Sequence, residues 1–296
     1  MIALLEQLQG ELLINEPLAK HTSWRVGGIA QQFYRPVSAQ DLAVFLSQLA
    51  EGEPVLWLGL GSNLLVRDGG FAGTVIATAG VLNALEIEGN KLNAEVGVYC
   101  AKLAKQAARA GLKGASFLAG IPGTLGGALA MNAGAHDGET WPLVSSVTTV
   151  DRQGVLRQRG PEDFTVSYRH VDIPEGEWFV SAELSLEEGD AEVEGADIKA
   201  LLKRRNITQP TNQPCAGSVF RNPENDFSGR LIEEMGLKGL TIGGASVSEK
   251  HANFIVNDGT ATAADIEALI FLLQQKIEQQ YGVRLQPEVH IVGELA

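Results

Sequence analysis

The chain has 296 residues, of which 45% are hydrophobic and 20% are charged, as is ordinary for a globular protein of two or three domains. Its formal net charge of −13 disfavours broad binding of nucleic acid or anionic membranes, because the average field repels such partners. An anionic small molecule would have to be held by local basic groups.

Targeting and redox signals indicate a cytoplasmic protein. No apolar run approaches the roughly 20 residues of a membrane span, and the first nine residues carry Glu6 and lack the basic region of a signal peptide. The two cysteines, Cys100 and Cys215, argue against a disulfide scaffold and for a reducing compartment.

Helices and short strands are mixed in the first half of the chain. Helical periodicity predicts an N-terminal helix over residues 1–14, and Ser38 followed by Asp41 marks the start of a second helix. An alanine-rich helix over 101–110 ends at Gly111. The predicted strands are residues 30–36, 55–58, 64–66 and 74–78, followed by a hairpin of residues 85–88 and 92–96.

The second half begins with more strands and ends with the clearest helix. Basic residues 198–205 predict a helix, and two prolines after it indicate a domain boundary near 195–210. Thr262 caps a helix over 263–281 that has one apolar stripe. Ser228 caps a shorter helix that ends at Gly236. Residues 147–151 and 155–159 predict a second hairpin, and the other predicted strands are residues 178–186, 244–247, 253–257 and 289–292. Strands mixed with helices and hairpins indicate an α+β protein.

Two glycine-rich stretches indicate an anion site. Residues 117–136 hold five glycines and almost no charge, and a second loop, Gly59-Leu60-Gly61-Ser62-Asn63, directly follows the apolar run 55–58. Glycine lets backbone N–H groups approach a phosphate closely. A run of turns would explain one such stretch, but two suit a ligand with two phosphates. Neither stretch fits the Rossmann or P-loop pattern.

Together these loops resemble the pyrophosphate-binding loops of flavoproteins related to vanillyl-alcohol oxidase. More narrowly, the chain is similar to the UDP-N-acetylenolpyruvoylglucosamine reductase family. Three further motifs carry this resemblance: Ser167-Tyr168-Arg169, Ala216-Gly217-Ser218-Val219-Phe220-Arg221-Asn222-Pro223 and Gln286-Pro287-Glu288-Val289. Each matches the family in type and order, and the combination spans nearly the whole chain.

The resemblance implies a fold and a division into domains. It implies an α+β fold with a two-part FAD-binding region of the vanillyl-alcohol-oxidase type and a C-terminal α+β substrate-binding domain. We expect the FAD-binding parts at residues 1–80 and 81–200, and the substrate-binding domain at residues 201–296, with its last strand carrying Glu288. Only 49 positions separate Arg169 from Ser218, which resembles the shorter, type II form of the family.

The resemblance also implies the cofactor and the reaction. FAD would be held without a covalent bond, and NADPH would serve as co-substrate. The family reduces UDP-N-acetylglucosamine enolpyruvate to UDP-N-acetylmuramate in peptidoglycan, or cell wall, synthesis. The implied FAD-binding residues are Gly59, Gly61, Ser62, Asn63, Gly120, Gly123, Thr124, Gly126, Gly127, Asn132 and Ala133. Among oligomeric states we favour a monomer.

By the same resemblance, Ser218 is the proton donor, with Arg169 and Glu288 beside it. Hydride addition to the enolpyruvyl C3 leaves negative charge at C2 that spreads into the carboxylate, and a guanidinium stabilises such charge. An enolate carbon is a strong base, so a positioned hydroxyl suffices to protonate it. Glu288 either orients the substrate or, if protonated, donates a hydrogen bond to the developing acid-enolate.

Two alternatives stay open. The chain could be another flavin oxidase of the same superfamily, acting on a sugar or alcohol, or a flavin- or nucleotide-sugar-binding module without catalysis. We interpret the basic triplet Lys203-Arg204-Arg205 as a solvated helix end rather than an anion site, and Cys215 as a packing residue. The five histidines lack metal-ligand spacing, so we expect no metal.

Overall fold

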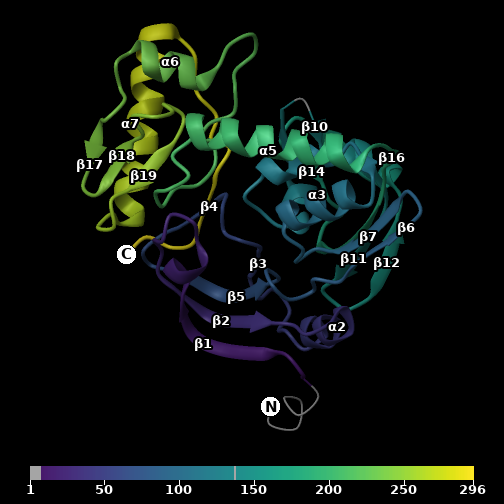
Figure 1. Cartoon of the computed structure of the whole chain (residues 1–296). Coiled ribbons are helices and arrows are strands. Elements are labelled where there is room, and N and C mark those ends of the chain that lie inside the picture. Colours follow the sequence, from purple (N-terminus) through teal and green to yellow (C-terminus); the bar gives the residue numbers. More distant parts are fainter. Residues whose placement is uncertain (1–7, 137) are drawn as a thin grey trace. The chain divides into compact units, whose positions relative to one another are not determined.

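The computed structural model describes residues 8–136 and 138–296, and the chain divides into two units (Figure 1). Unit 1 comprises Met1–Leu13, Gln32–Gly59 and Gly73–Lys203. Unit 2 comprises Ile14–Gln31, Leu60–Ala72 and Arg204–Ala296. Each unit is therefore built from stretches that are far apart in sequence, and the expected three-domain boundaries at 80 and 200 stay a prediction.

A five-stranded antiparallel sheet forms the centre of unit 1, in the order β12-β11-β15-β7-β6. The two predicted hairpins are both confirmed. In β7, Leu92 and Ala94 are buried and alternate with exposed residues, as the period of a strand requires. The strands are β6 (Leu85–Glu88), β7 (Lys91–Glu95), β11 (Val144–Asp151), β12 (Leu156–Arg159) and β15 (Glu177–Ser185).

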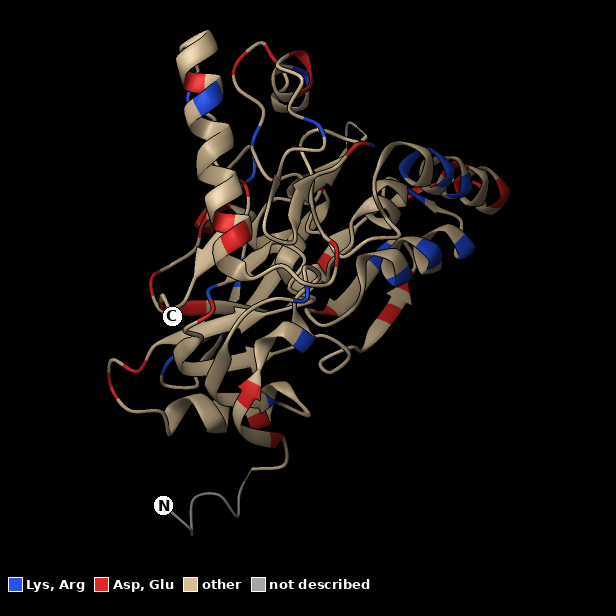
Figure 2. Cartoon of the chain, turned by 90° about the vertical axis from the view of Figure 1, so that its left-hand side faces the viewer, with Lys and Arg blue, Asp and Glu red and all other residues tan. Residues whose placement is uncertain are grey.

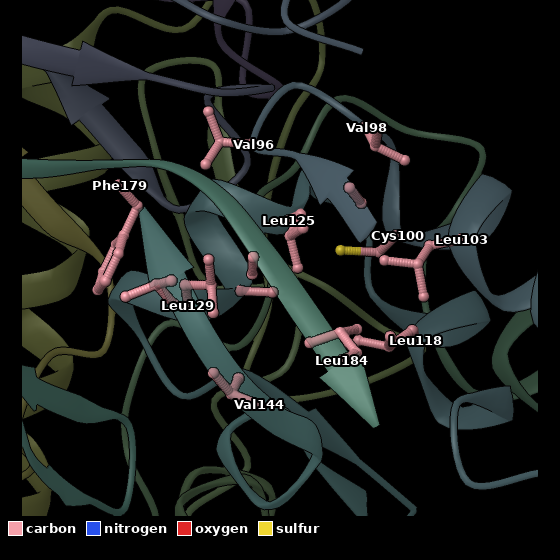
Figure 3. Close-up of a cluster of buried hydrophobic side chains, with 14 of the residues drawn as sticks. Val96, Val98, Cys100, Leu103, Leu118, Leu125, Leu129, Val144, Phe179 and Leu184 are labelled. Carbon is pink, nitrogen blue, oxygen red and sulfur yellow. The ribbon is translucent and has the colours of Figure 1, made fainter. Parts of the chain in front are cut away.

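The core of unit 1 lies where helices pack on this sheet (Figure 3). Cys100 and Leu103 come from α3 (Cys100–Arg109), and Leu125 and Leu129 come from α4 (Leu125–Ala130). They pack in one buried cluster with Leu184 of β15. A leucine buried this completely stabilises the fold by roughly 1.5–3 kcal/mol.

A smaller sheet in the order β1-β2-β5-β3 precedes the large one in the chain. β3 (Val55–Leu58) runs parallel to β5 (Phe71–Ala77). The predicted cap of α2 (Ala39–Ser47) is confirmed, because Ser38 Oγ accepts a hydrogen bond from the Asp41 amide at 3.1 Å.

The prediction of a helix over residues 1–14 is wrong for the part that the structure describes, residues 8–14. Glu11–Pro17 forms strand β1, which lies beside β2 (Ile29–Arg35) in the smaller sheet, and residues 1–7 lie outside the described residues. Gly10 and Pro17 bound the segment, and the Gly10 amide donates to the Tyr34 hydroxyl at 3.2 Å. Pairing with a distant strand thus overrides the local helical pattern.

Unit 2 is built around α7 (Ala263–Tyr281), which has the predicted bounds. A capping box begins it: the Asp265 amide donates to Thr262 Oγ1 at 3.1 Å, and the Thr262 amide donates to Asp265 Oδ2 at 2.9 Å. Strands β17 (Thr241–Ile242), β18 (Ala245–Val247) and β19 (Ile255–Asn257) form a small antiparallel sheet. β4 (Leu64–Val66) pairs in parallel with β20 (His290–Val292).

Two helices differ in their bounds from the sequence predictions. α5 (Ala191–Thr208) begins seven residues earlier and ends three residues later than expected. Gly195 and the absence of an apolar stripe hide its first turns. Ser228 is the first residue of α6 (Ser228–Glu234) rather than its cap, and its hydroxyl instead donates to the Arg221 carbonyl at 2.6 Å.

Short elements complete the chain. They are η1 (Leu18–His21), β8 (Leu112–Lys113), η2 (Ser116–Gly120), β9 (Gly134–Ala135), β10 (Gly138–Glu139), η3 (Trp141–Leu143), η4 (Pro161–Asp163), β13 (Thr165–Ser167), β14 (His170–Asp172) and β16 (Glu187–Glu188). Figure 2 shows acidic and basic residues interspersed along the chain, with long uncharged stretches between them. Over the described ranges, every helix is too short or too polar to cross a bilayer.

Two side chains tie the early segments of unit 2 to its C-terminal part. Trp24 is fully buried, and its indole N–H donates to the Ile255 carbonyl at 2.7 Å. The Asp68 carboxylate accepts the Ala263 and Ala264 amides at 3.0 and 2.9 Å. It therefore satisfies the first N–H groups of α7 from a distant point in the sequence and complements the helix dipole.

We expect Asp68→Ala to lower the free energy of unfolding by about 1–2 kcal/mol, the usual cost of a lost helix cap. Urea unfolding followed by circular dichroism measures this as a lower midpoint at unchanged slope. Glu224→Ala is the control, because it removes one exposed carboxylate from the same unit. Equal midpoints for the two variants would contradict the capping role.

Candidate functional site

The two glycine-rich loops meet within unit 1 at Gly59 and Thr124. A Cβ on Gly59 would lie 2.6 Å from Oγ1 of Thr124, so glycine at this position lets the Thr124 side chain pack against the loop backbone. Among the residues that the structure describes, the buried Thr124 hydroxyl has no hydrogen-bond partner. A buried hydroxyl without a partner fits contact with a bound oxygen-rich ligand, such as the pyrophosphate of FAD.

The amides of the central loop are arranged differently from the sequence prediction. Gly123 and Gly126 were expected to offer free N–H groups to phosphate, but both amides, and that of Leu125 between them, donate to carbonyls of the protein. The acceptors for Gly123, Leu125 and Gly126 are Ile121, Val98 and Val96, at 2.9, 2.8 and 2.9 Å respectively. The bonds to Val96 and Val98 hold the loop against the segment that leads into α3, so a phosphate would be contacted by other groups of the loop.

The glycines of the loop serve two different purposes. A Cβ on Gly126 would lie 3.0 Å from the Cβ of Val96, so glycine is needed there for packing against the protein. A Cβ on Gly127 would meet nothing within 4 Å, and Gly127 is exposed. Gly120 is half-buried beside the His136 ring. Gly127 therefore marks the open side of the loop.

Asn132 and Ala133 organise the end of the central loop. Asn132 is buried with φ of 39°, its Nδ2 donates to Glu139 Oε2 at 3.0 Å and its Oδ1 accepts the Trp141 amide at 3.1 Å. The Ala133 carbonyl accepts from the Thr140 hydroxyl at 2.7 Å. Their contact with FAD stays a prediction, and their structural role is to fix the loop.

Arg169 is anchored to this same end of the loop. Its guanidinium donates to the Gly134 carbonyl at 2.6 Å and to the Asn132 carbonyl at 3.3 Å, and it lies 5.0 Å from the centre of the Tyr168 ring. Asn132, His136 and Arg169 all have positive φ, between 39° and 56°. Such unfavourable backbone conformations persist where the surroundings demand them, and they gather at functional sites.

In unit 2, the second glycine loop leads to Ser218 and Glu288. The Ser62 carbonyl accepts the Gly217 amide at 3.2 Å. The Asn63 Nδ2 donates to the Glu288 carbonyl at 3.0 Å. Gly61 has φ of +60°, and a Cβ there would overlap the His21 carbonyl. The structure therefore brings Ser62 and Asn63 to the backbone around both predicted catalytic residues of this unit.

Ser218 and Glu288 lie on adjacent extended segments, and Glu288 precedes the last strand, β20 (His290–Val292), instead of lying on it as predicted. The Glu288 amide donates to the Val219 carbonyl at 2.8 Å, and the Arg221 amide donates to the Gln286 carbonyl at 2.9 Å. Both Ser218 and Glu288 are half-buried. Of the predicted catalytic set, unit 2 joins these two, while Arg169 belongs to unit 1.

Ser218 lines a pocket of about 470 Å³ in unit 2. Its lining residues are Ser218, Asn222, Phe227, Gly229, Arg230, Glu233, Lys250, His251, Ala252 and Asn253. Burial lowers the pKa of His251, and the nearby charge of Lys238 lowers it further. Lys250 and Arg230 supply positive charge, although Arg230 also pairs with Asp226 and Glu234.

Sequence reasoning missed most of this pocket. Its signal was the polar run Ser248-Glu249-Lys250-His251-Ala252-Asn253 between two apolar strands, where a loop carries chemistry-bearing residues. A second hollow, of about 300 Å³, lies over the large sheet of unit 1 and contains none of the predicted site residues.

The other residues singled out in the sequence have structural roles. Burial raises the pKa of the Cys100 thiol to about 12 and also raises the pKa of Cys215, so neither is an activated nucleophile. Arg205 is half-buried and donates to Gln209 Oε1 at 3.2 Å, and burial lowers its pKa. Within residues 8–136 and 138–296 there is no group of three potential metal ligands.

Two family models match the chain. The model described as "FAD binding domain" covers residues 30–159. The model described as "UDP-N-acetylenolpyruvoylglucosamine reductase, C-terminal domain" covers residues 209–292, and so includes Ser218, the pocket and Glu288.

Relatives match over almost the whole length. A protein named UDP-N-acetylenolpyruvoylglucosamine reductase from Alkalilimnicola ehrlichii is 61% identical over 285 residues, which are 96% of each chain. The protein of that name from Methylococcus capsulatus is 59% identical, over 97% of this chain and 94% of the relative. The crystal structure of UDP-N-acetylenolpyruvylglucosamine reductase from Thermus caldophilus matches with a TM-score of 0.82 and 32% identity, over 96% of this chain and 99% of that one.

We expect Thr124→Val to weaken FAD binding about tenfold or more, because a hydrogen bond to the ligand is worth about 1.5 kcal/mol or more when the ligand is charged. The FAD-free protein should keep its thermal stability, because the hydroxyl has no partner within the described part of the chain. Fluorescence titration of the FAD-free protein measures the affinity.

Thr149→Val is the matched control, because Thr149 is buried in the same unit and its hydroxyl donates to Glu177 Oε2 at 2.6 Å. It should lower stability by about 1–3 kcal/mol and leave the FAD affinity unchanged. If Thr124→Val binds FAD as tightly as the wild type, its hydroxyl does not contact the cofactor.

Proposed function

The chain belongs to the UDP-N-acetylenolpyruvoylglucosamine reductase family of FAD-dependent oxidoreductases, and from this we propose the substrates and the reaction. The protein reduces UDP-N-acetylglucosamine enolpyruvate to UDP-N-acetylmuramate with NADPH, as a step of peptidoglycan synthesis. The observation that carries the proposal is Ser218, half-buried in a pocket of unit 2 and held on a backbone segment beside Glu288.

The residues of unit 1 fit FAD. Thr124 and Gly59 would hold the pyrophosphate, with Gly127 on the open side of the loop. When bound, FAD supplies the hydride chemistry, taking a hydride from NADPH and delivering one to C3 of the enolpyruvyl group. The reductase model over residues 209–292, which includes Ser218, favours the reductase over an oxidase of the same superfamily.

Arg169 stabilises the charge that develops on the substrate. Hydride addition at C3 places negative charge at C2 and in the attached carboxylate, and a nearby guanidinium lowers the energy of that charge. Two carbonyls of the central loop hold the Arg169 guanidinium in a fixed orientation. Little reorganisation is then needed during the reaction, which is how preorganised charge accelerates a step.

Ser218 completes the reaction by giving its hydroxyl proton to C2. The backbone on both sides of Ser218 is hydrogen-bonded, through Gly217 to Ser62 and through Val219 to Glu288, so the hydroxyl is presented from a fixed point. Glu288 lies on the adjoining segment, where its carboxyl group orients the substrate or donates to the acid-enolate oxygen.

The pocket provides the local positive charge that a protein of net charge −13 needs in order to bind an anionic nucleotide sugar. Lys250 lines it, and the described part of the chain shows its ammonium donating to the Asn206 carbonyl rather than to a carboxylate. Phe227 also lines the pocket and is exposed. Lys250 is thus the charge that contacts the diphosphate in this proposal.

We expect Ser218→Ala to separate the two half-reactions. Bleaching of the flavin by NADPH needs no proton from Ser218 and should stay within a few-fold of the wild-type rate. Reoxidation by the enolpyruvyl substrate should slow by about 10²–10⁴-fold, the range for a lost general acid. Stopped-flow absorbance under nitrogen follows each half, and a mutant flavin that substrate reoxidises at the normal rate would show that Ser218 is not the donor.

Arg169→Lys should also act on the second half-reaction. Lysine keeps the charge but loses the planar fork, and with it the paired hydrogen bonds to the central loop. We expect the rate of substrate reoxidation to fall at least tenfold, while the NADPH half-reaction changes much less. Equal losses in both halves would instead indicate that Arg169 supports the loop structure alone.

A further inference from the structure

Asn253 makes a two-point hydrogen-bond pair with the backbone close to Ser218. The residue is only 4% exposed and lies just before β19. Its Nδ2 donates to the Phe220 carbonyl at 2.8 Å, and its Oδ1 accepts the Phe220 amide at 3.0 Å. The backbone carbonyl of Asn253 also accepts the Val219 amide at 2.9 Å. The Asn253 side chain thus makes the pair of hydrogen bonds to Phe220 that the backbone of a neighbouring strand would otherwise make.

The opposite edge of the same segment is held by the extended segment that carries Glu288. The Val219 carbonyl accepts the Glu288 amide at 2.8 Å, and Phe220 forms an antiparallel bridge with Pro287. The segment is therefore hydrogen-bonded along both edges, as a central strand is. Ser218 is the first residue beyond this doubly held stretch, so the direction of its hydroxyl follows from how the stretch is fixed.

Asn253 is itself fixed by a tight turn. Its amide donates to Nδ1 of His251 at 3.2 Å, and the Phe254 amide donates to the His251 carbonyl at 3.0 Å. The His251 ring packs edge-on against Phe254, with ring centres 4.9 Å apart. A carboxamide held this firmly can orient the groups that it contacts.

We propose that Asn253 is a positioning residue for proton delivery, holding the Phe220 peptide so that the Ser218 hydroxyl faces the substrate carbon. This inference rests on the proposed function, in which Ser218 is the donor. Asparagine suits the role because its planar side chain offers one donor and one acceptor side by side. A carboxylate offers acceptors alone, so it would repel the Phe220 carbonyl.

The test is Asn253→Asp, followed through both half-reactions as a function of pH. At pH 8 the aspartate is ionised, and we expect reoxidation by UDP-N-acetylglucosamine enolpyruvate to slow at least tenfold, since small displacements of reacting groups carry penalties of up to about 100-fold. Flavin bleaching by NADPH should stay within twofold of the wild-type rate. As the pH falls, the protonated aspartic acid regains a donor and an acceptor, so the reoxidation rate relative to wild type should rise through one protonation.

Asn257→Asp is the matched control. Asn257 is also buried in unit 2, and its side chain donates to the Trp24 carbonyl at 2.8 Å and accepts the Gly259 and Ala261 amides. It makes a comparable set of backbone bonds away from Ser218. We expect it to lower thermal stability without a selective loss of the second half-reaction.

Three results would overturn the inference. One is an unchanged reoxidation rate in Asn253→Asp at pH 8, and another is an equal loss in both half-reactions. If Asn253→Asp does not fold at pH 8, Asn253→Ser takes its place, because a hydroxyl keeps one of the two bonds. A reoxidation rate equal to wild type would again overturn the inference.

A different result would overturn the proposed function itself: NADPH bleaches the flavin of the wild-type protein, but UDP-N-acetylglucosamine enolpyruvate does not reoxidise it. The wild-type traces alone reveal this outcome.

Discussion

Unit 2 depends on points where two stretches of backbone touch with no side chain between them. Gly61 has φ of +60°, and a Cβ on it would overlap the His21 carbonyl. At Gly70, with φ of +84°, a Cβ would overlap the Ile29 carbonyl. These contacts bring the two early segments of the unit together, and β4 then pairs in parallel with β20. The position of the backbone at Gly217 and Glu288 follows from these crossings, because Ser62 and Asn63, which bond to it, directly follow Gly61.

The residues proposed for the chemistry come from both units. Unit 1 contains the unpartnered Thr124 hydroxyl, proposed to contact the cofactor, and the guanidinium of Arg169, which is anchored to the central loop. Unit 2 supplies the proposed proton donor, the carboxyl group of Glu288 and the pocket cation Lys250. In both units the key side chain is held through main-chain carbonyls and amides. Such bonds depend little on the neighbouring side chains, so they fix the site without crowding it.

Local patterns in the sequence predicted most of the regular elements, because their causes are local. The capping box of Thr262 and Asp265 and the hairpin turn at Gly89 and Asn90 involve residues within three or four positions of one another. The N-terminal segment was mispredicted because its hydrogen-bond partner lies on another strand. The glycines were identified as important, but their reasons differ: Gly126 serves packing against Val96, and the neighbouring amides are used within the protein.

The candidate-site residues that stand in short sequence motifs were predicted. Those that matter only through contacts with distant segments were missed. Ser218, Arg169 and Glu288 stand in short recognisable motifs. Asn253 does not, since its importance arises from bonds to a segment 33 positions away. The discontinuous make-up of unit 2 was also beyond local reasoning, because nothing near Trp24 in sequence shows that its indole will bond to Ile255.

That last contact has a consequence for how the protein is made. Trp24 and Ile255 are 231 positions apart, and at about 5–20 residues per second a ribosome needs roughly 10–50 s to synthesise the chain between them. Throughout that interval the early segments of unit 2 have no helix α7 to cover them, so apolar side chains such as Trp24 and Leu65 stay open to water and to other chains. The unit can close only after α7 has been synthesised, so the cost of its long-range contacts is a period in which these side chains are exposed to aggregation.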